Sequence, residues 1–513
     1  MSIDYWLLNV NNFAMKTYNY KNILPYILLA ELVSLSGFLL PEINALAFFA
    51  IIALTLVAAM VSLELGLLIL FTELFIGSKG QLFFFEAGGV LVSIRIALWL
   101  VIMSVWAAKF LNLYFKKEIN KRKIKKLLDN NKLFSYFLIF LFFIAWGIIC
   151  GFINNNSFNN IFFDANGWLY FLLIFPVFTL PLVEPKFNYK KFRDNLSAIF
   201  MASIIWLSLK TLILLYFFSH NLLGVVEPLY RWVRVSGVGE ITNMVSGFPR
   251  IFFQSHIFVL IGLFFVLTES LKTKINFKEK KVYWIIGLLS LLLATTIISF
   301  SRSNWLGLSV GFLFSYFLIF LFTKAKWKNL LRTTLIIFAS TALSLILIAG
   351  IIKFPIPTPG TGFSASFIQE RATSLSGEAG VSSRWSLLPE LLNEIKKAPI
   401  LGAGFGATVS YKTSDPRVLE QNPGGQYTTY AFEWGFLDIW LKLGLLGLSA
   451  YASLIIMIFV IAWDKIKKQD ITVWGLLLGL IAISTVSFFS PYLNHPLGIG
   501  YVILVAFLIN NKV

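Results

Sequence analysis

The sequence has few charged residues. Asp, Glu, Lys and Arg make up only 13% of its 513 residues, whereas 58% are hydrophobic. A typical soluble domain has about 25% charged residues. So little polar surface could not cover a water-soluble protein of this size, and the composition excludes a soluble globular enzyme.

Cysteine is almost absent. Cys150 is the only one, which excludes an internal disulfide bond and a cysteine metal cluster. A removable signal peptide is also not expected, because Asp4 lies early and no small-residue cleavage site follows a short apolar core. Targeting is then left to the first membrane spans.

Acidic residues are scarcer than basic ones, with 25 Asp plus Glu against 43 Lys plus Arg and a net charge of +18. In a soluble protein this balance would suggest nucleic acid as a partner. Here the basic residues cluster in short loops between hydrophobic runs, as cytoplasmic loops of membrane proteins do. We therefore expect no nucleic-acid partner and take the excess charge as an orientation signal.

Hydrophobic runs long enough to cross a bilayer, about 20 residues each, recur from Ile23 almost to the C-terminus. The sequence predicts an all-α polytopic membrane protein in which residues 1–513 form a single membrane domain. Roughly fourteen transmembrane helices are expected, at 24–40, 43–59, 62–77, 93–115, 133–152, 167–183, 195–218, 251–271, 282–299, 304–323, 331–352, 435–463, 473–490 and 497–511.

The basic loops predict the orientation. Those expected in the cytoplasm are 116–126, 186–193, 272–281, 324–332 and 465–468. Both termini then lie in the cytoplasm, and the outer segments are 78–92, 153–166, 219–250 and 353–434.

The outer segment 353–434 is the longest interruption, and long loops in compact proteins tend to be functional. Within it, 385–397 is predicted to be a short amphipathic helix that can lie along the membrane surface. Its apolar face is expected to hold Leu388, Leu391, Leu392 and Ile395.

Arg302 opens the tenth expected span, directly after Ser301. An ionisable group at that depth is costly, so it usually faces the protein interior or a wet cavity. The alternative is that Arg302 reaches out to lipid phosphates.

A second cluster of polar residues precedes the eighth expected span. Arg231 and Arg234 lie among aromatic residues and are also explained as an interfacial belt. Arg250 lies where the chain re-enters the bilayer and is the better anion-binding candidate, because guanidinium matches phosphate in a bidentate way. His256 follows one turn into the span, where a packing role is the alternative.

The long outer loop supplies further candidates. Arg384 lies in its expected helix, and Gly402 and Gly404 would let backbone amides approach a ligand closely. Glu433, at the return to the membrane, is a candidate general base. Asp438 and Lys442, four residues apart on a helix, are explained as a structural ion pair.

These motifs resemble the O-antigen ligase and O-antigen polymerase family of bacterial envelope glycosyltransferases. The family combines many spans, a long outer loop late in the chain, a Ser-Arg pair that opens a span, and an Arg-Trp stretch that leads to Pro-x-x-Gly-x-Gly. Here these are Ser301-Arg302, Arg384-Trp385 and 399–404, in the expected order. The resemblance covers residues 225–450.

One departure concerns the end of the loop. Ligases of the family usually have His-Asn there, then Leu and Gly-x-x-Gly, whereas this sequence has Glu433-Trp434 before Leu437, Gly444 and Gly447. Glu433 thus stands where the usual histidine base would be. This favours a polymerase or a less typical branch over standard ligase chemistry.

The resemblance implies an inverting, metal-independent and cofactor-free polymerase of the bacterial cytoplasmic (inner) membrane. Its substrates would be a polyprenyl diphosphate-linked oligosaccharide and a glycan acceptor at the membrane lipid surface, and a chain-length regulator is a further candidate partner. Arg250, Arg302 and Arg384 would bind the diphosphate, with Glu433 as base and His256 as its substitute. Other binding candidates are Arg231, Arg234, Ser301, Gly402, Gly404 and His495, the last of which lies in the final outer turn.

Two alternatives stay open. A ligase would move finished glycan onto a lipid or protein acceptor. A transporter or flippase would carry an anionic lipid-linked substrate and would need charged residues in mid-span, where Glu31 and Glu64 stand isolated in the sequence.

Overall fold

The computed structural model describes residues 19–222, 224–235, 239–244, 247–272, 280–358, 360, 379–468 and 470–510. The predicted cytoplasmic position of the two chain ends, and residues 361–378 of the long outer segment, lie outside this description.

Helices make up most of the described chain. Their bounds are α2 Tyr20–Leu39, α3 Pro41–Val61, α4 Leu63–Ile76, α5 Ile94–Phe115, α6 Lys121–Asn130, α7 Lys132–Ile153, α8 Phe158–Ala165, η1 Trp168–Leu173, α9 Ile174–Phe178, α10 Leu180–Val183, α11 Tyr189–Ser219, α12 Val226–Val235, α13 His256–Lys272, α14 Lys280–Ile298, α15 Arg302–Phe322, α16 Lys326–Ile352, α18 Ala379–Lys397, α19 Pro416–Gln421, α20 Gly435–Lys467, α21 Thr472–Val486, η2 Tyr492–Asn494 and α22 Pro496–Asn510.

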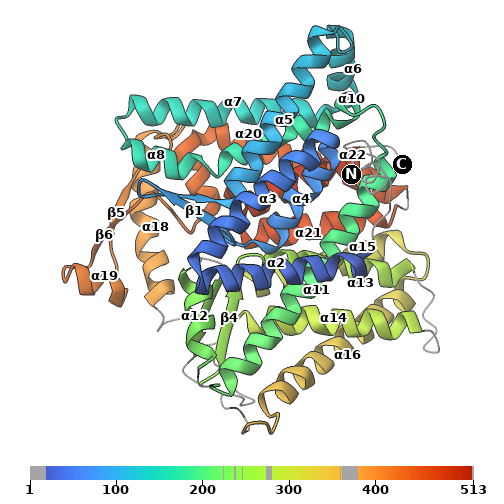
Figure 1. The fold of residues 1–513 in the computed structure, drawn as a ribbon, viewed down its shortest axis with the longest axis vertical. Coiled ribbons are helices and arrows are strands. Elements are labelled where there is room, and N and C mark those ends of the chain that lie inside the picture. Colours follow the sequence, from blue (N-terminus) through green and yellow to red (C-terminus); the bar gives the residue numbers. More distant parts are fainter. Residues whose placement is uncertain are drawn as a thin grey trace.

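Short strands pair only as antiparallel hairpins within the described residues. They are β1 Phe84–Ala87 with β2 Val90–Ser93, β3 Gly239–Asn243 with β4 Pro249–Phe253, and β5 Val409–Lys412 with β6 Gln426–Thr429. The hairpins lie in segments that the sequence places outside the membrane, except that the ends of β2 and β4 reach into the expected spans 93–115 and 251–271. Figure 1 shows β5, β6, α18 and α12 on the left side of the molecule.

Nine of the described helices are long and apolar enough to cross a bilayer, or ten if α8 and the bent continuation through η1 and α9 form one span. The predicted all-α polytopic fold is confirmed. Several of the roughly fourteen expected spans correspond to shorter apolar helices, among them α13, α21 and α22, which fall below the about 20 residues of a full crossing.

The expected eighth span begins later than its hydrophobicity indicates. Pro249 to Phe253 form β4, whose side chains alternate between buried and half-buried positions, and the helix α13 starts only at His256. The expected span takes Ile251 to Phe253 as the first turn of the helix, although the polar residues Gln254, Ser255 and His256 separate them from its apolar run.

The predicted apolar face of α18 is confirmed for Leu391 and Ile395, but the packed face is rotated toward Leu387. Leu387, Leu391 and Ile395 are buried, and they pack with residues of β5 and the start of α20. Leu392, expected on the apolar face, is 36% exposed. The helix begins six residues earlier than predicted, at Ala379.

Several buried charges in the helical core are paired, although Glu64 is buried with no ion pair among the described residues. Lys442 Nζ lies 2.5 Å from Asp438 Oδ1 and 2.5 Å from Asp164 Oδ1, so the predicted Asp438–Lys442 pair is confirmed and a third member joins it. Glu31, isolated in the sequence, accepts from Lys210 Nζ at 2.8 Å. Such pairs are costly to break, because the remaining charge is left uncompensated in a low dielectric.

Candidate active site

The β3–β4 hairpin positions Arg250. Its Nε donates to the backbone carbonyl of Ser299 at 3.1 Å, and its Cζ lies 5.3 Å from the centre of the Phe252 ring. Arg250 Nη1 also lies 3.6 Å from Glu240 Oε2, on the opposite strand. The hairpin therefore holds this guanidinium against the turn that joins α14 to α15.

Glu240 is shared between two arginines. Arg234 Nη1, from α12, approaches Glu240 Oε1 to 3.7 Å, so the acid lies between Arg234 and Arg250. Arg231 faces elsewhere: it forms an exposed pair with Glu227, with Nε and Oε1 2.6 Å apart. This local contact within α12 accounts for Arg231 as a surface residue.

Arg302 begins α15 directly after a strained turn. Phe300 has a φ of 47°, a left-handed conformation that is uncommon for an aromatic residue and is found mainly at functional sites. The side chain of Ser301 then accepts from Asn304 N and caps the helix. A cation at a helix N-terminus is opposed by the helix dipole, so helix stability does not explain why this position holds arginine.

Ser301 also belongs to a chain of hydroxyl groups. Its Oγ lies 3.1 Å from Ser303 Oγ, which lies 3.0 Å from Ser490 Oγ in the last outer turn. These contacts fix the start of α15 against the segment that follows α21.

Arg384 lies in α18 and completes the cluster. Its Nε pairs with Glu433, and its carbonyl accepts from Trp434 Nε1 at 3.0 Å. Burial lowers the pKa of Arg384, and the positive charges of Arg302 and Arg250 lower it further. Contacts also link the three elements that carry these arginines. Arg250 donates to the Ser299 carbonyl, three residues before Arg302. Ser303 contacts Ser490, and the ring centre of the adjacent Phe489 lies 5.3 Å from that of Trp434, which is bonded to the Arg384 carbonyl.

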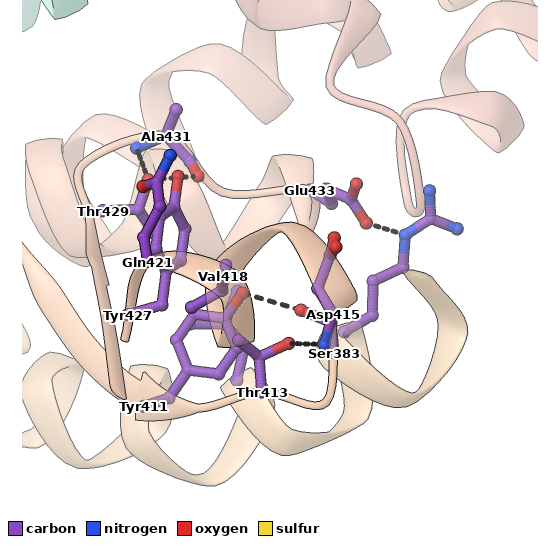
Figure 2. Close-up of a pocket in the computed structure, with 12 residues that line it drawn as sticks. Ser383, Tyr411, Thr413, Asp415, Val418, Gln421, Tyr427, Thr429, Ala431 and Glu433 are labelled. Atoms are coloured by element: carbon purple, nitrogen blue, oxygen red, sulfur yellow. Dashed lines mark hydrogen bonds and ion pairs between the residues drawn. The ribbon is translucent and has the colours of Figure 1, made fainter. Parts of the chain in front are cut away.

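Glu433 lies at the edge of a pocket of about 470 Å³ in the long outer segment (Figure 2). The pocket is lined by Ser383, Arg384, Leu387, Tyr411, Thr413, Asp415, Val418, Gln421, Tyr427, Thr429, Ala431 and Glu433. The structure thus brings Arg250, Arg302, Arg384 and Glu433 into one region and places a polar pocket beside them.

His256 does not line this pocket. Its side chain is buried, with Nε2 2.9 Å from Thr211 Oγ1 and Nδ1 accepting from Phe253 N. Both ring nitrogens of His256 are hydrogen-bonded within the protein. This favours the packing role, which was the alternative to a functional one.

Gly402 and Gly404 have left-handed backbones, with a φ of 80° each, and both are buried. Their amides donate to the carbonyls of Ala398 and Lys442. A Cβ on Gly404 would lie 2.1 Å from Gly151 N. The close approach that these glycines permit is therefore to α7 and α20 in this structure.

The glycine loop is also tied to the buried charges of the core. The amide of Gly406 donates to Asp164 Oδ2 at 2.8 Å, and Asp164 pairs with Lys442. These contacts join the glycine loop of the long outer segment to α8 and α20.

His495 follows η2 in the last outer turn, where its side chain is exposed and its amide donates to the Tyr492 carbonyl. The Tyr492 hydroxyl donates to the carbonyl of Gln254, between β4 and α13. The turn is therefore fixed near Arg250, but His495 is not among the residues that line the pocket.

Residues 287–452 match the family model described as O-Antigen ligase. Over these residues the chain is similar to the O-antigen ligase family. The matched region runs from α14 into α20 and contains Arg302, Arg384 and Glu433, whereas Arg250 precedes it. No match was found among curated proteins.

This match confirms the resemblance to the ligase and polymerase family. Together with the long apolar helices, it indicates a multi-pass protein of the inner membrane. The matched residues begin at 287, so the predicted resemblance of residues 225–286 stays a prediction.

Sequence reasoning missed Glu240 as the partner of two arginines, Asp164 as the partner of Lys442, and the pocket itself. Glu240 could not be identified as the partner of these arginines, because its strand pairing was not predicted. The sequence held one usable signal for the pocket: Val or Tyr alternates with Ser or Lys in 409–412, a period of two that is typical of a strand.

Proposed function

We propose that this chain is a membrane glycosyltransferase that polymerises polyprenyl diphosphate-linked repeat units on the outer side of the inner membrane. The observation that supports this most is the convergence of Arg250, Arg302 and Arg384 with Glu433 beside a polar pocket. The match to the O-antigen ligase family supports the same class of donor and acceptor.

The arginines would bind the diphosphate of the donor. Guanidinium groups match phosphate oxygens in a bidentate way, and positive groups placed where negative charge develops stabilise the transition state. Arg384 Nε pairs with Glu433, so its two terminal nitrogens are the donors that a phosphate would take.

The transfer balances without a further reactant. The oxygen of an acceptor hydroxyl attacks the anomeric carbon of the donor sugar, and a new carbon–oxygen bond forms with inversion. The bond from that carbon to the phosphate oxygen breaks, and its electron pair leaves with polyprenyl diphosphate. The hydroxyl proton passes to the Glu433 carboxylate, which acts as general base.

A ligase is the alternative within the class, because the match to the O-antigen ligase family is compatible with both reactions. Glycan chain length in a deletion strain distinguishes them. Loss of long chains is the result expected of a polymerase. Intact long chains that stay on the carrier lipid would instead identify a ligase.

A transporter is the alternative from another class. Of the two acids named for that alternative, Glu31 is paired with Lys210, and Arg95 is paired with Glu73 in the same way, which favours a structural role for these four. Proteoliposomes supplied with lipid diphosphate-linked repeat unit are expected to form a new glycosidic bond. Uptake of labelled substrate with no new bond would contradict the proposal.

A further inference from the structure

The pocket beside Glu433 is built by the long outer segment alone. Tyr411 comes from β5 and Tyr427 from β6, with ring centres 6.0 Å apart. Gln421 ends α19, and Ser383 in α18 holds the Tyr411 hydroxyl through an oxygen–oxygen contact of 2.8 Å. Figure 2 shows the two tyrosines on one side of the pocket and Asp415 and Glu433 on the other.

The lining combines flat aromatic faces with short polar groups. Tyr427 is 42% exposed, so part of its ring is open to a ligand, whereas Tyr411 is buried beneath it. Hydroxyl and amide groups of Thr413, Thr429 and Gln421 can both donate and accept hydrogen bonds. A sugar ring presents apolar C–H faces and many hydroxyl groups, and this lining fits both. The volume also lies in the range of small-ligand sites, roughly 300–1,000 Å³.

The charges separate this pocket from the arginine cluster. Its lining has two carboxylates, Asp415 and Glu433, and one guanidinium, Arg384, which is paired with Glu433. Arg250 and Arg302 do not line it. A diphosphate is therefore drawn to the arginine side, and an anionic sugar would meet a carboxylate in the pocket.

We infer that this pocket binds the acceptor glycan through sugar residues without a negative charge, with one ring against Tyr427 and the attacking hydroxyl directed to Glu433. The inference rests on the proposed function, since it assigns the second substrate of the same site. The donor glycan has the same chemistry, and the experiment must separate the two sources.

The first measurement is equilibrium binding by calorimetry, with the full chain in nanodiscs. The probe is the repeat-unit oligosaccharide released from the lipid carrier of a deletion strain, which lacks the diphosphate. Tyr427→Ala is compared with Tyr230→Ala, because Tyr230 is 38% exposed in an outer helix and does not line the pocket. Tyr427→Ala is expected to weaken binding roughly tenfold, and Tyr230→Ala to leave it unchanged.

The second measurement is kinetic. With lipid-linked repeat unit as donor and the lipid-free oligosaccharide as acceptor, Tyr427→Ala and Gln421→Ala should raise KM for the acceptor and leave KM for the donor unchanged. A raised KM for the donor alone would assign the pocket to the donor glycan and overturn the inference.

The charge of the pocket gives a third comparison. Oxidising primary hydroxyls of the oligosaccharide to carboxylates should weaken binding to the wild type, and Asp415→Asn should restore part of it. Tighter binding of the oxidised probe would contradict the inference.

The outcomes separate the inference from the proposed function. If the wild type binds the oligosaccharide and Tyr427→Ala does not, the pocket is a glycan-binding site even if no glycosidic bond forms. If the wild type transfers glycan but the binding affinity and the acceptor KM are equal in Tyr427→Ala and Tyr230→Ala, the proposed transferase activity is supported. The pocket is then not the acceptor site.

Discussion

Replacing Lys442 by methionine should destabilise the protein strongly, because Lys442 neutralises two buried carboxylates. The side chains of Lys442, Asp164 and Asp438 are 2%, 7% and 6% exposed, and Nζ lies 2.5 Å from an oxygen of each acid. Methionine fills a similar volume but leaves both carboxylates without a cation. Removing one partner of a buried ion pair costs about 3–5 kcal/mol.

The same helix provides a matched control. Lys467 pairs with Asp464 at 3.7 Å, but the two side chains are 58% and 64% exposed, and exposed pairs contribute about 0–1 kcal/mol. Lys467→Met should therefore have little effect. A second variant, Lys442→Met with Asp438→Asn, removes one of the two stranded charges and should recover part of the loss.

The free energy of unfolding would be measured by equilibrium denaturation in mixed detergent micelles, followed by tryptophan fluorescence. The reasoning predicts a large loss for Lys442→Met, a partial recovery in the double variant and a small change for Lys467→Met. Equal effects of Lys442→Met and Lys467→Met would refute it, since the buried pairing would then contribute no more than a surface contact.

Three further predictions concern single positions. Gly404→Ala should lower the free energy of unfolding more than Gly224→Ala does. Both glycines have a φ near 80°, but a Cβ at Gly404 would lie 2.1 Å from Gly151 N, whereas a Cβ at Gly224 has no atom within 4 Å. Similar unfolding midpoints would show that the predicted clash is relieved. Ser301→Ala should lower the free energy of unfolding by about 1 kcal/mol through loss of the helix cap. The control Ser309→Ala, at an exposed position, should lower it by less than about 0.5 kcal/mol. An unchanged unfolding midpoint for Ser301→Ala would show that the cap does not stabilise the protein. Arg384→Lys should lower the rate of transfer at least about tenfold while the protein stays folded, because lysine cannot bind phosphate in a bidentate way, and wild-type rates would exclude that mode of binding.

The membrane fold could be predicted from the sequence because long apolar runs separated by basic loops have few other solutions. Boundaries were less predictable where two elements share one apolar run. Ile251 to Phe253 are apolar like the helix that follows, and their pairing with β3 shows that they belong to a strand.

The convergence of the arginines could not be predicted from the sequence. Arg250 and Arg384 are separated by more than a hundred positions and lie in a hairpin and a loop helix, so their proximity depends on how α14, α15 and α18 pack. The residue types were informative nonetheless, because a guanidinium at a membrane boundary requires an anion, a polar cavity or water.

The predicted roles of the glycines show a different limit. Gly402 and Gly404 were expected to bring amides near a ligand, and the same freedom here brings them near α7 and α20. A left-handed glycine indicates close approach, but the sequence does not show what is approached.

The proposed transfer at the arginine cluster and Glu433 can be tested by extension of a lipid diphosphate-linked repeat unit with purified protein and no added divalent cation. Wild type is compared with Arg302→Ala and Glu433→Gln, and the exposed outer pair provides the controls Arg231→Ala and Glu227→Gln. The account predicts a ladder of products for the wild type and both controls, and none for folded Arg302→Ala or Glu433→Gln. A wild type that forms no bond, or a Glu433→Gln variant that extends glycan at the wild-type rate, would contradict it.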